Sequence, residues 1–231
     1  MKGKQRLKEL SVARALSKFI WKLRNTSKAS VSRSFWERRY SDGGTSGPGS
    51  YGQCAEFKSA TITKVLELHA VNSVIDFGCG DGNQIRELSG IQYSGIDVSA
   101  DAVERCRSMY AQDPDKTFMV AEDYKGETAE LAMSLDVIFH LVEDEIYESY
   151  MGRLFRASEK LVLIYSSNFE QLCFNPFRSP THVRHRKFTD WVNKKAPGWR
   201  LAERISNPYR LTARTTPKTH SFADFYLFLR E

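Results

Sequence analysis

The chain has 231 residues and a mass of 26.5 kDa, which suits one domain with an appendage and is too short for two full domains. Apolar residues make up 41% and charged residues 27%, the balance of a soluble globular chain, and no apolar run approaches the ~20 residues that cross a bilayer. Membrane-spanning, collagenous and largely disordered classes are therefore excluded.

The net charge of +6 is concentrated at the N-terminus. Residues 1–40 contain twelve Lys or Arg and two Glu, a net +10, so residues 41–231 carry −4. The pattern predicts a basic amphipathic N-terminal arm over 1–40, followed by a globular domain over 41–231. Apolar residues recur in the arm at helical spacing while basic residues occupy its other faces: Leu7, Leu10, Ala13, Leu16, Ile20 and Leu23 against Lys4, Lys8, Arg14, Lys18 and Lys22.

Three roles are open for this arm. It packs on its own domain, or residues 1–30 contact an anionic membrane or a glycan assembly held there, or it binds nucleic acid. Charge alone gives only nonspecific phosphate affinity, so no specific nucleic-acid partner is expected. The four cysteines form no Cys-x-x-Cys pair and no secretory signal is visible, which favours a cytoplasmic location, including the inner face of a membrane.

Beyond the arm, strands and helices alternate. Residues 41–50 (SDGGTSGPGS) predict a loop, which is either a plain linker or a lid over a ligand. Expected strands lie at 73–77, 92–97, 116–121, 130–134 and 161–165, with expected helices at 55–69, from 84, at 100–110 and at 144–157. This alternation implies an α/β, doubly wound, mostly parallel sheet. The strand-like segments 199–205 and 224–229 are expected to add an antiparallel pair at its edge.

The strongest signal is a strand that runs into a glycine-rich turn, VIDFGCGDGNQ over 74–84. Glycines there let the backbone approach a ligand at the carboxyl edge of the sheet. Asp97 ends the next strand, seventeen residues after Gly80, where a carboxylate can accept hydrogen bonds from two ribose hydroxyls. Asn83 stands where a dinucleotide site has its third glycine, and Asp81 would repel a pyrophosphate. A ligand with a sulfonium and an ammonium group tolerates that carboxylate and Asp76 beside it.

These residues resemble the first motif of class I S-adenosylmethionine-dependent methyltransferases, and IDVS over 96–99 resembles their acidic second motif. The resemblance extends over about residues 36–231 and implies a Rossmann-like fold with S-adenosylmethionine as cofactor. It implies that the glycine turn faces the methionine part, Asp97 the ribose and Val98 the adenine. Independently of the resemblance, the lid interpretation expects Tyr40, Ser46 and Tyr51 near the methionine end. The candidate cofactor-binding residues are Tyr40, Ser46, Asp76, Gly78, Cys79, Gly80, Asp97, Val98, Glu122 and Asp123.

Residues 131–144 (LAMSLDVIFHLVED) resemble the fourth motif of the same superfamily, which places Asp136 beside the transferable methyl group. Asp136 and His140 are four residues apart, so they share a face if the segment is helical. Three interpretations are open. His140 takes the proton from an acceptor hydroxyl, or Asp136 and His140 hold a divalent metal ion, or His140 is a structural residue of the cofactor pocket.

Polar residues also follow the fifth strand. YSSN over 165–168 ends at the same edge of the sheet, and THVRHRKF over 181–188 is dense in hydrogen-bond donors. The functional interpretation is that Asn168, His182, Arg184 and His185 contact a polar or anionic acceptor. The alternative is a solvated, charged face.

Taken together, the motifs resemble a bacterial methyltransferase family associated with surface-glycan biosynthesis, which implies O-methylation of a sugar or glycan hydroxyl. A sulfonium is already a good leaving group, so the protein must chiefly align the acceptor oxygen and remove its proton, which favours Asp136 and His140 as the catalytic pair. The alternatives are methylation of a nucleic acid or protein, suggested by the basic arm, and a binding module that keeps the cofactor fold without turnover.

Overall fold

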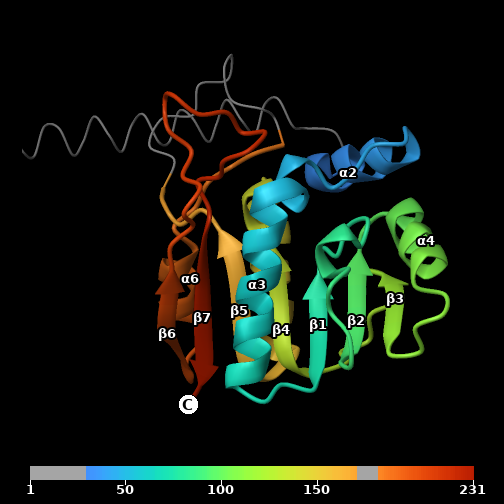
Figure 1. Cartoon of the computed structure of the whole chain (residues 1–231). Coiled ribbons are helices and arrows are strands. Elements are labelled where there is room, and N and C mark those ends of the chain that lie inside the picture. The colour runs from blue at the N-terminus through green and yellow to red at the C-terminus, as the bar shows by residue number, and fades with distance from the viewer. Residues whose placement is uncertain (1–29, 171–181) are drawn as a thin grey trace, which may run out of the picture.

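The computed structural model describes residues 30–170 and 182–231. Its seven strands form one sheet in the order β3-β2-β1-β4-β5-β7-β6, in which β1 to β5 are parallel and β7 is antiparallel to both of its neighbours (Figure 1). The expected fold class is therefore confirmed. The strands are β1 (Ser73–Phe77), β2 (Gln92–Asp97), β3 (Lys116–Val120), β4 (Ala129–Leu135), β5 (Ser158–Ser166), β6 (Trp199–Ile205) and β7 (Asp224–Arg230).

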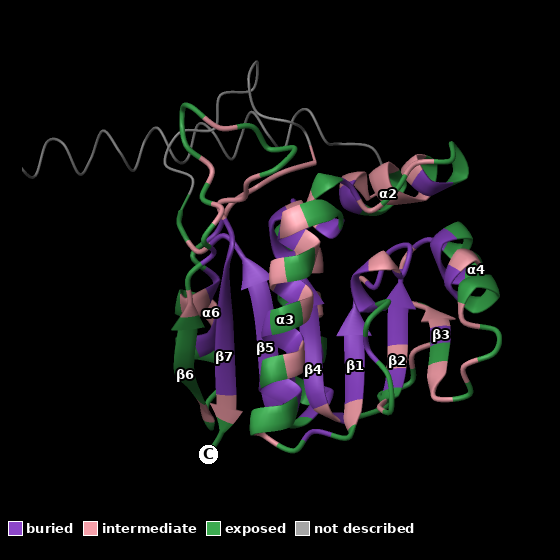
Figure 2. Ribbon diagram, in the orientation of Figure 1, coloured by how far each residue is buried: buried purple, intermediate pink, exposed green. Residues whose placement is uncertain are grey.

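Helices cover both faces of the sheet, because side chains of the central strands alternate between two apolar layers. In β4, Leu131 and Met133 pack in the layer under α3 and α4, while Ala132 packs in the layer under α5 and α6. The central strands are consequently buried along most of their length (Figure 2). The helices are α2 (Val31–Ser41), α3 (Gly52–Leu68), α4 (Ala100–Met109), α5 (Asp144–Arg156) and α6 (Phe188–Lys195).

All seven expected strands are present, and three of the expected helices correspond to α3, α4 and α5. The helix expected from residue 84 is wrong, since only a short 3-10 turn forms at Asn83–Ile85. The chain must reverse quickly there to reach β2, and Gly90 turns it with a φ of +68°. Neither α2 nor α6 is among the separate helices expected from the sequence.

α2 lies across the carboxyl edge of the sheet, close to α4 (Figure 1). The predicted border between arm and domain, after Tyr40, falls inside this helix. The apolar and basic residues that predicted an amphipathic helix, between 4 and 23, lie outside the described residues. Within the described part of the chain, no helix is both long and apolar enough to span a membrane.

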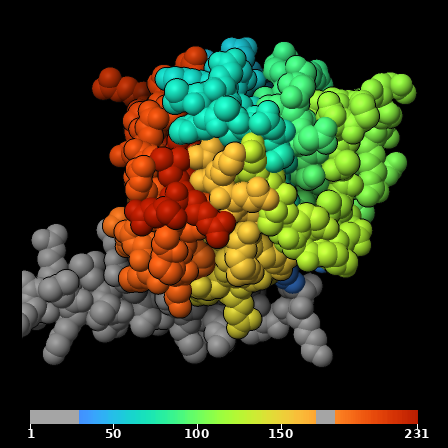
Figure 3. All heavy atoms as spheres, turned by 90° about the horizontal axis from the view of Figure 1, so that it is seen from below, coloured from blue at the N-terminus to red at the C-terminus, as the bar shows by residue number. Residues whose placement is uncertain are grey.

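The two ends of the strands have different neighbours. The carboxyl ends of β1, β2 and β4 point toward α2, whereas the opposite edge is seen from below in Figure 3, where cyan to green segments pack beside orange to red ones. Parallel α/β sheets place their ligands at the carboxyl edge. The functional site is therefore sought between the strand ends and α2.

Candidate functional site

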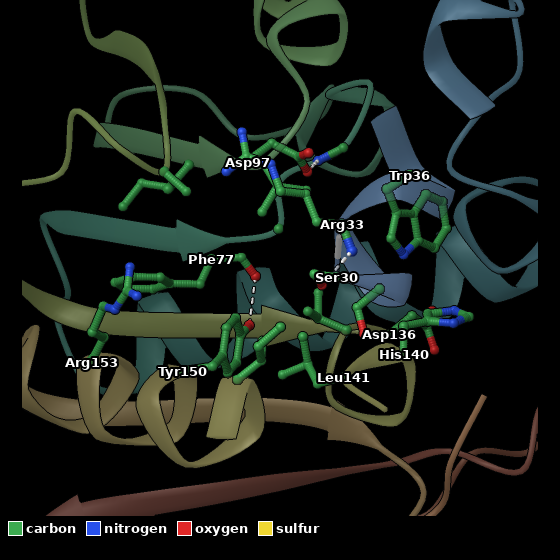
Figure 4. A pocket seen from close by; sticks show the side chains of 18 of the residues that line it. Ser30, Arg33, Trp36, Phe77, Asp97, Asp136, His140, Leu141, Tyr150 and Arg153 are labelled. Carbon is green, nitrogen blue, oxygen red and sulfur yellow. Dashed lines mark hydrogen bonds between the residues drawn. The ribbon is translucent and has the colours of Figure 1, made fainter. Parts of the chain in front are cut away.

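A cavity of about 710 Å³ lies at the carboxyl ends of β1, β2 and β4, beneath α2 and beside α5 (Figure 4). This volume is within the usual range for small-molecule sites. Nine of the sixteen residues proposed from sequence line it: Tyr40, Ser46, Gly78, Gly80, Asp97, Val98, Glu122, Asp136 and His140. The other seven lie outside its lining: Asp76, Cys79, Asp123, Asn168, His182, Arg184 and His185.

The glycine turn leaves no room for side chains. Gly78 has a φ of +87°, and a Cβ there would lie 2.4 Å from Val137 Cγ2. Gly80 has a φ of +59°, and a Cβ there would lie 2.3 Å from Ser46 Oγ. Both positions require glycine because of their backbone conformation and because of these close neighbours. The backbone therefore forms part of the cavity wall itself.

Asp97 stands at the end of β2 and is only 7% exposed. The amide of Gly80 donates to its Oδ2 and the amide of Ser99 to its Oδ1, both at 2.9 Å. Burial raises the pKa of Asp97, while these backbone hydrogen bonds oppose the shift. A carboxylate oxygen can accept more than one hydrogen bond, so Asp97 retains acceptor capacity toward a ligand in the cavity.

The loop over 41–50 is folded onto the glycine turn. Ser46 N donates to Asp81 Oδ2 at 2.8 Å, and Asp81 N donates to Ser46 Oγ at 3.0 Å. The hydroxyl of Tyr51 also donates to Asp81, at 2.9 Å, and that of Tyr40 lies 2.9 Å from Ser46 Oγ. These reciprocal bonds join the loop to the turn and favour the lid over the plain linker. Asp81 is thus an anchor for the lid.

Asp76 and Cys79 lie behind the turn rather than in the cavity wall. Asp76 is 2% exposed and accepts a hydrogen bond from the Tyr93 hydroxyl at 2.8 Å, while its Oδ1 has no partner among the described residues. Burial raises the pKa of Asp76 to about 7. A hydrogen bond with Cys106, together with burial, raises the pKa of the Cys79 thiol well above its usual value. Cys79 is therefore a packed, un-ionised thiol at the back of the turn.

Asp136 follows β4 in a left-handed conformation, with a φ of +60°, and only a short 3-10 turn forms at Ile138–His140. The helical spacing that predicted a shared face for Asp136 and His140 is therefore wrong. The two side chains nevertheless lie side by side at one end of the cavity (Figure 4). The tight turn after the strand brings them together in place of a helix.

His140 is oriented by a carbonyl group. Its Nδ1 lies 2.9 Å from the carbonyl oxygen of His182, and because a carbonyl only accepts, Nδ1 carries the hydrogen. Nε2 is then the unprotonated, accepting nitrogen. Burial lowers the pKa of His140 to about 4. The ring is consequently neutral near pH 7, with a fixed tautomer, and Trp36 packs edge-on against it at 4.9 Å between centroids.

Lys58 was not anticipated from the sequence. It lies in the interior of α3 with 1% of its side chain exposed, and its Nζ is 2.8 Å from Asp136 Oδ2. The same ammonium is 5.3 Å from the centroid of the Tyr165 ring. No local pattern reveals this pair, because 78 residues separate its members. A lysine on the buried face of a predicted helix was the one available signal.

α2 closes the cavity from above. Glu143, at the start of α5, accepts hydrogen bonds from the backbone amide of Val31 at 2.6 Å and from the Ser30 hydroxyl at 3.1 Å. It also contacts the Ser32 hydroxyl, and Arg33 reaches Glu122 on the opposite rim. The first turn of α2 is therefore fastened to both sides of the cavity. Figure 4 shows Ser30, Arg33 and Trp36 over the site.

The cavity continues along α5 because residues 121–128, which join β3 to β4, contain no helix. Phe77, Tyr124 and Tyr150 line this part, and the Tyr150 hydroxyl donates to the Phe77 carbonyl at 2.8 Å. Arg153 lies at its far end (Figure 4). The aromatic walls fit a planar, apolar group such as a nucleobase.

Three of the four residues proposed for the acceptor contact Phe139 or His140: His182 and His185 through their rings, and Arg184 through its amide. His182 stacks on Phe35 at 3.8 Å between centroids, and Arg184 pairs with Asp144 at 3.0 Å. His185 Nδ1 lies 2.8 Å from the Ser167 hydroxyl, and the Asn168 amide donates to Thr189 at 3.1 Å. Their role in acceptor binding stays a prediction. Thr181, the start of that basic segment, lies outside the described residues.

Across residues 30–170 and 182–231, no group of three or more His, Cys, Asp or Glu is placed to hold a metal ion. Asp136 is paired with Lys58, and His140 uses Nδ1 for the His182 carbonyl. With Nδ1 engaged, His140 offers Nε2 toward a ligand, and this nitrogen can accept a proton.

Comparisons with known proteins agree with this geometry. Residues 74–160 match a family model described as a methyltransferase domain. The chain is similar in structure to the N-methyltransferase NodS from Bradyrhizobium japonicum WM9, solved with S-adenosylhomocysteine, with a TM-score of 0.64 and 12% identity over 86% of this chain and 98% of that chain.

Two further solved structures are similar. The magnesium protoporphyrin IX methyltransferase from Synechocystis PCC 6803, with bound S-adenosylmethionine, gives a TM-score of 0.62 at 13% identity, covering 89% of this chain and 100% of that chain. An S-adenosylmethionine-dependent methyltransferase from Clostridium acetobutylicum gives a TM-score of 0.58 at 11% identity, covering 76% of this chain and 92% of that chain. No curated protein matches the chain. The glycine turn, Asp97 and Asp136 therefore all lie within the segment that matches the methyltransferase-domain model.

Proposed function

We propose that this protein is an S-adenosylmethionine-dependent O-methyltransferase that acts on a sugar or glycan hydroxyl. The observation that carries the proposal is His140, a neutral imidazole held in one tautomer at the cavity wall beside Asp136. An alcohol is a poor nucleophile until its proton is removed, and a positioned base supplies that help. An amine acceptor would have less need of it.

The residues present fit S-adenosylmethionine. Gly78 and Gly80 bring bare backbone to the cavity wall, Asp97 can accept from a ribose, and the aromatic walls near Tyr124 can receive an adenine. Carboxylates gathered at this end suit a ligand with positive groups and would repel a pyrophosphate.

When bound, the cofactor supplies an electrophilic methyl carbon, whose bonding pair stays on sulfur as the acceptor oxygen forms the new O–C bond. His140 Nε2 takes the proton that leaves the acceptor hydroxyl. Asp136 presents a carboxylate oxygen that can accept a hydrogen bond from a neighbouring hydroxyl of the acceptor and so help to orient it. The protein's remaining task is alignment, which α2 and the lid provide by closing the cavity and excluding water.

The residues that line the cavity next to His140 and Asp136 support a sugar as the acceptor. Trp36 and Tyr40 line the cavity next to His140 and Asp136, so an apolar ring face and hydrogen-bond acceptors adjoin. A sugar has both an apolar face and hydroxyl edges. Lys58 balances the charge of Asp136, which removes the net negative charge that an ammonium acceptor would favour.

The test is a screen of acceptors with methyl-labelled S-adenosylmethionine, with release of S-adenosylhomocysteine measured in parallel. Sugars, nucleotide-sugars and lipid-linked glycans are compared with amino sugars, peptides and RNA. Label in a base-stable, acid-stable ether on a sugar supports the proposal, and loss of turnover in His140→Ala but not in His69→Ala supports the base. Label on nitrogen, RNA or peptide would refute it, as would cofactor binding without any transfer.

A further inference from the structure

The buried ion pair between Lys58 and Asp136 weighs against an ammonium acceptor, and it also bears on the transfer step. Lys58 is 1% exposed, Asp136 is 22% exposed, and their charged atoms are 2.8 Å apart. Only Asp136 of the two lines the cavity. A buried pair of this kind costs desolvation and is weak evidence for stability by itself, so its retention beside a reaction centre calls for another explanation.

The pair is held rigidly from several sides. Asp136 occupies a left-handed backbone conformation, and its amide donates to the Tyr165 carbonyl at 2.9 Å. Gly49 of the lid loop approaches so closely that a Cβ there would lie 2.9 Å from Asp136 Oδ2. Lys58 is fixed over the Tyr165 ring. With Oδ2 committed to Lys58, Oδ1 is the carboxylate oxygen left for a ligand.

Methyl transfer changes the charge next to this pair. The sulfonium carries a full positive charge before the reaction, and that charge is dispersed as the methyl group leaves. A bare carboxylate at this point would stabilise the starting state more than the transition state, which tightens binding and slows the reaction. A compensated carboxylate still accepts a hydrogen bond from the acceptor but exerts little net field on the sulfonium.

We propose that Lys58 is a positioning residue that cancels the charge of Asp136 beside the transferring methyl group and aims its free oxygen at the acceptor. The inference rests on the proposed function, because it concerns the same site. It predicts that Asp136 raises, and Lys58 lowers, the preference of the site for the charged sulfur of S-adenosylmethionine over the uncharged sulfur of S-adenosylhomocysteine.

The experiment measures the binding of S-adenosylmethionine and S-adenosylhomocysteine to the full chain by isothermal titration at pH 8. These two ligands differ by the methyl group and one positive charge. Lys58→Met leaves Asp136 uncompensated and should raise the preference for S-adenosylmethionine about tenfold, the scale of one charge within ~10 Å at an effective dielectric constant near 20. Asp136→Asn leaves Lys58 uncompensated and should lower that preference by a similar factor.

The double variant Lys58→Met/Asp136→Asn removes both charges and should restore the wild-type preference. Lys64→Met is the matched control, because Lys64 is an exposed lysine of the same helix, and it should change nothing. If Lys58→Met does not fold, Asp136→Asn and the double variant still give the contrast. In a transfer assay, Lys58→Met should lower both KM for the cofactor and kcat, whereas Lys58→Arg should restore kcat.

A purely structural role for Lys58 would weaken both ligands equally and leave their ratio unchanged, which would overturn the inference. The same holds if Lys58→Met and Asp136→Asn shift the ratio in one direction. Failure of the proposed function looks different, since the wild-type chain would then bind neither ligand, or bind both and transfer no methyl group to a sugar hydroxyl. Binding of both by wild type, with a ratio insensitive to all variants, removes only the role of Lys58.

Discussion

Replacing Gly80 with alanine tests whether the glycine turn and the lid loop act as one unit. A side chain at a φ of +59° costs about 1–2 kcal/mol in the left-handed region. The new Cβ would also lie 2.3 Å from Ser46 Oγ and 2.8 Å from the Tyr40 hydroxyl, distances that no side chain tolerates. Ser46 must therefore move, and the lid must move with it.

The cost of that movement follows from the hydrogen bonds that Ser46 makes. It donates to Asp81 through its amide, accepts from the Asp81 amide, and bonds the Tyr40 hydroxyl. At about 0.5–1.5 kcal/mol net for each bond, their loss adds to the backbone strain, and Gly80→Ala should lower the free energy of unfolding by about 3–5 kcal/mol. Affinity for S-adenosylmethionine should fall as well.

Gly90→Ala provides the matched control. Gly90 has a φ of +68°, close to that of Gly80, but a Cβ there would meet nothing within 4 Å. The free energy of unfolding of Gly90→Ala should therefore fall only by the backbone cost of about 1–2 kcal/mol, and the variant should keep its cofactor affinity. Urea unfolding measures the stability of both variants, and isothermal titration measures binding. Equal losses of stability, or unchanged cofactor affinity in Gly80→Ala, would refute the coupling of turn and lid.

Four other predictions follow from the site. Asp97→Ala should lose about 1.5–3 kcal/mol of cofactor binding free energy by titration, the scale of hydrogen bonds to a charged group, and unchanged affinity would contradict its role. His140→Ala should lower turnover by roughly 10²–10⁴ with cofactor affinity preserved. Because the pKa of His140 is about 4, His140 stays unprotonated and wild-type turnover should persist until the pH falls toward that value, whereas a loss of turnover centred at pH 6.5 would oppose this. The pKa of Asp76 is raised from 3.8 to about 7 in the folded state. Between pH 3.8 and about 7 the folded protein therefore binds a proton that the unfolded chain does not, and this contribution to stability is lost as the pH rises through that range. Asp76→Asn should remove this part of the pH dependence in urea unfolding, and parallel curves of stability against pH for both proteins would count against it. Deleting residues 1–29 should preserve cofactor binding and weaken sedimentation with anionic vesicles, unless the arm has no role in targeting, in which case both chains sediment alike.

The sequence was informative wherever the determining interactions are local. The strands follow from runs such as 73–77, and the glycine turn follows because positive φ and close backbone approach demand glycine at Gly78 and Gly80. Asp97 was found by its spacing from the turn, since the length of one crossover fixes where the next strand ends. These features depend on a few neighbouring residues, and their periods or spacings are visible in one sequence.

What the sequence did not reveal depends on pairs that are distant along the chain. Lys58 and Asp136 are 78 residues apart, and Val31 and Glu143 are 112 apart. Nothing near Glu143 shows that its carboxylate serves a helix from the N-terminal region. The expected helix between Asp136 and His140 failed for a different reason, because the backbone enters a left-handed turn at Asp136 that a non-glycine residue adopts only when its surroundings compensate.

The way in which α2 begins has a consequence for how the cavity opens. The backbone amides of the first turn of α2 donate hydrogen bonds to its own Ser30 and to Glu143 across the cavity rim, so part of its N-terminal cap belongs to another element. Swinging α2 away exposes the amides of Val31 and Ser32 to water and removes a carboxylate from the positive end of the helix dipole. If ligand exchange requires α2 to swing away, we expect it to be faster at high ionic strength, where the attraction between Glu143 and the helix end is screened.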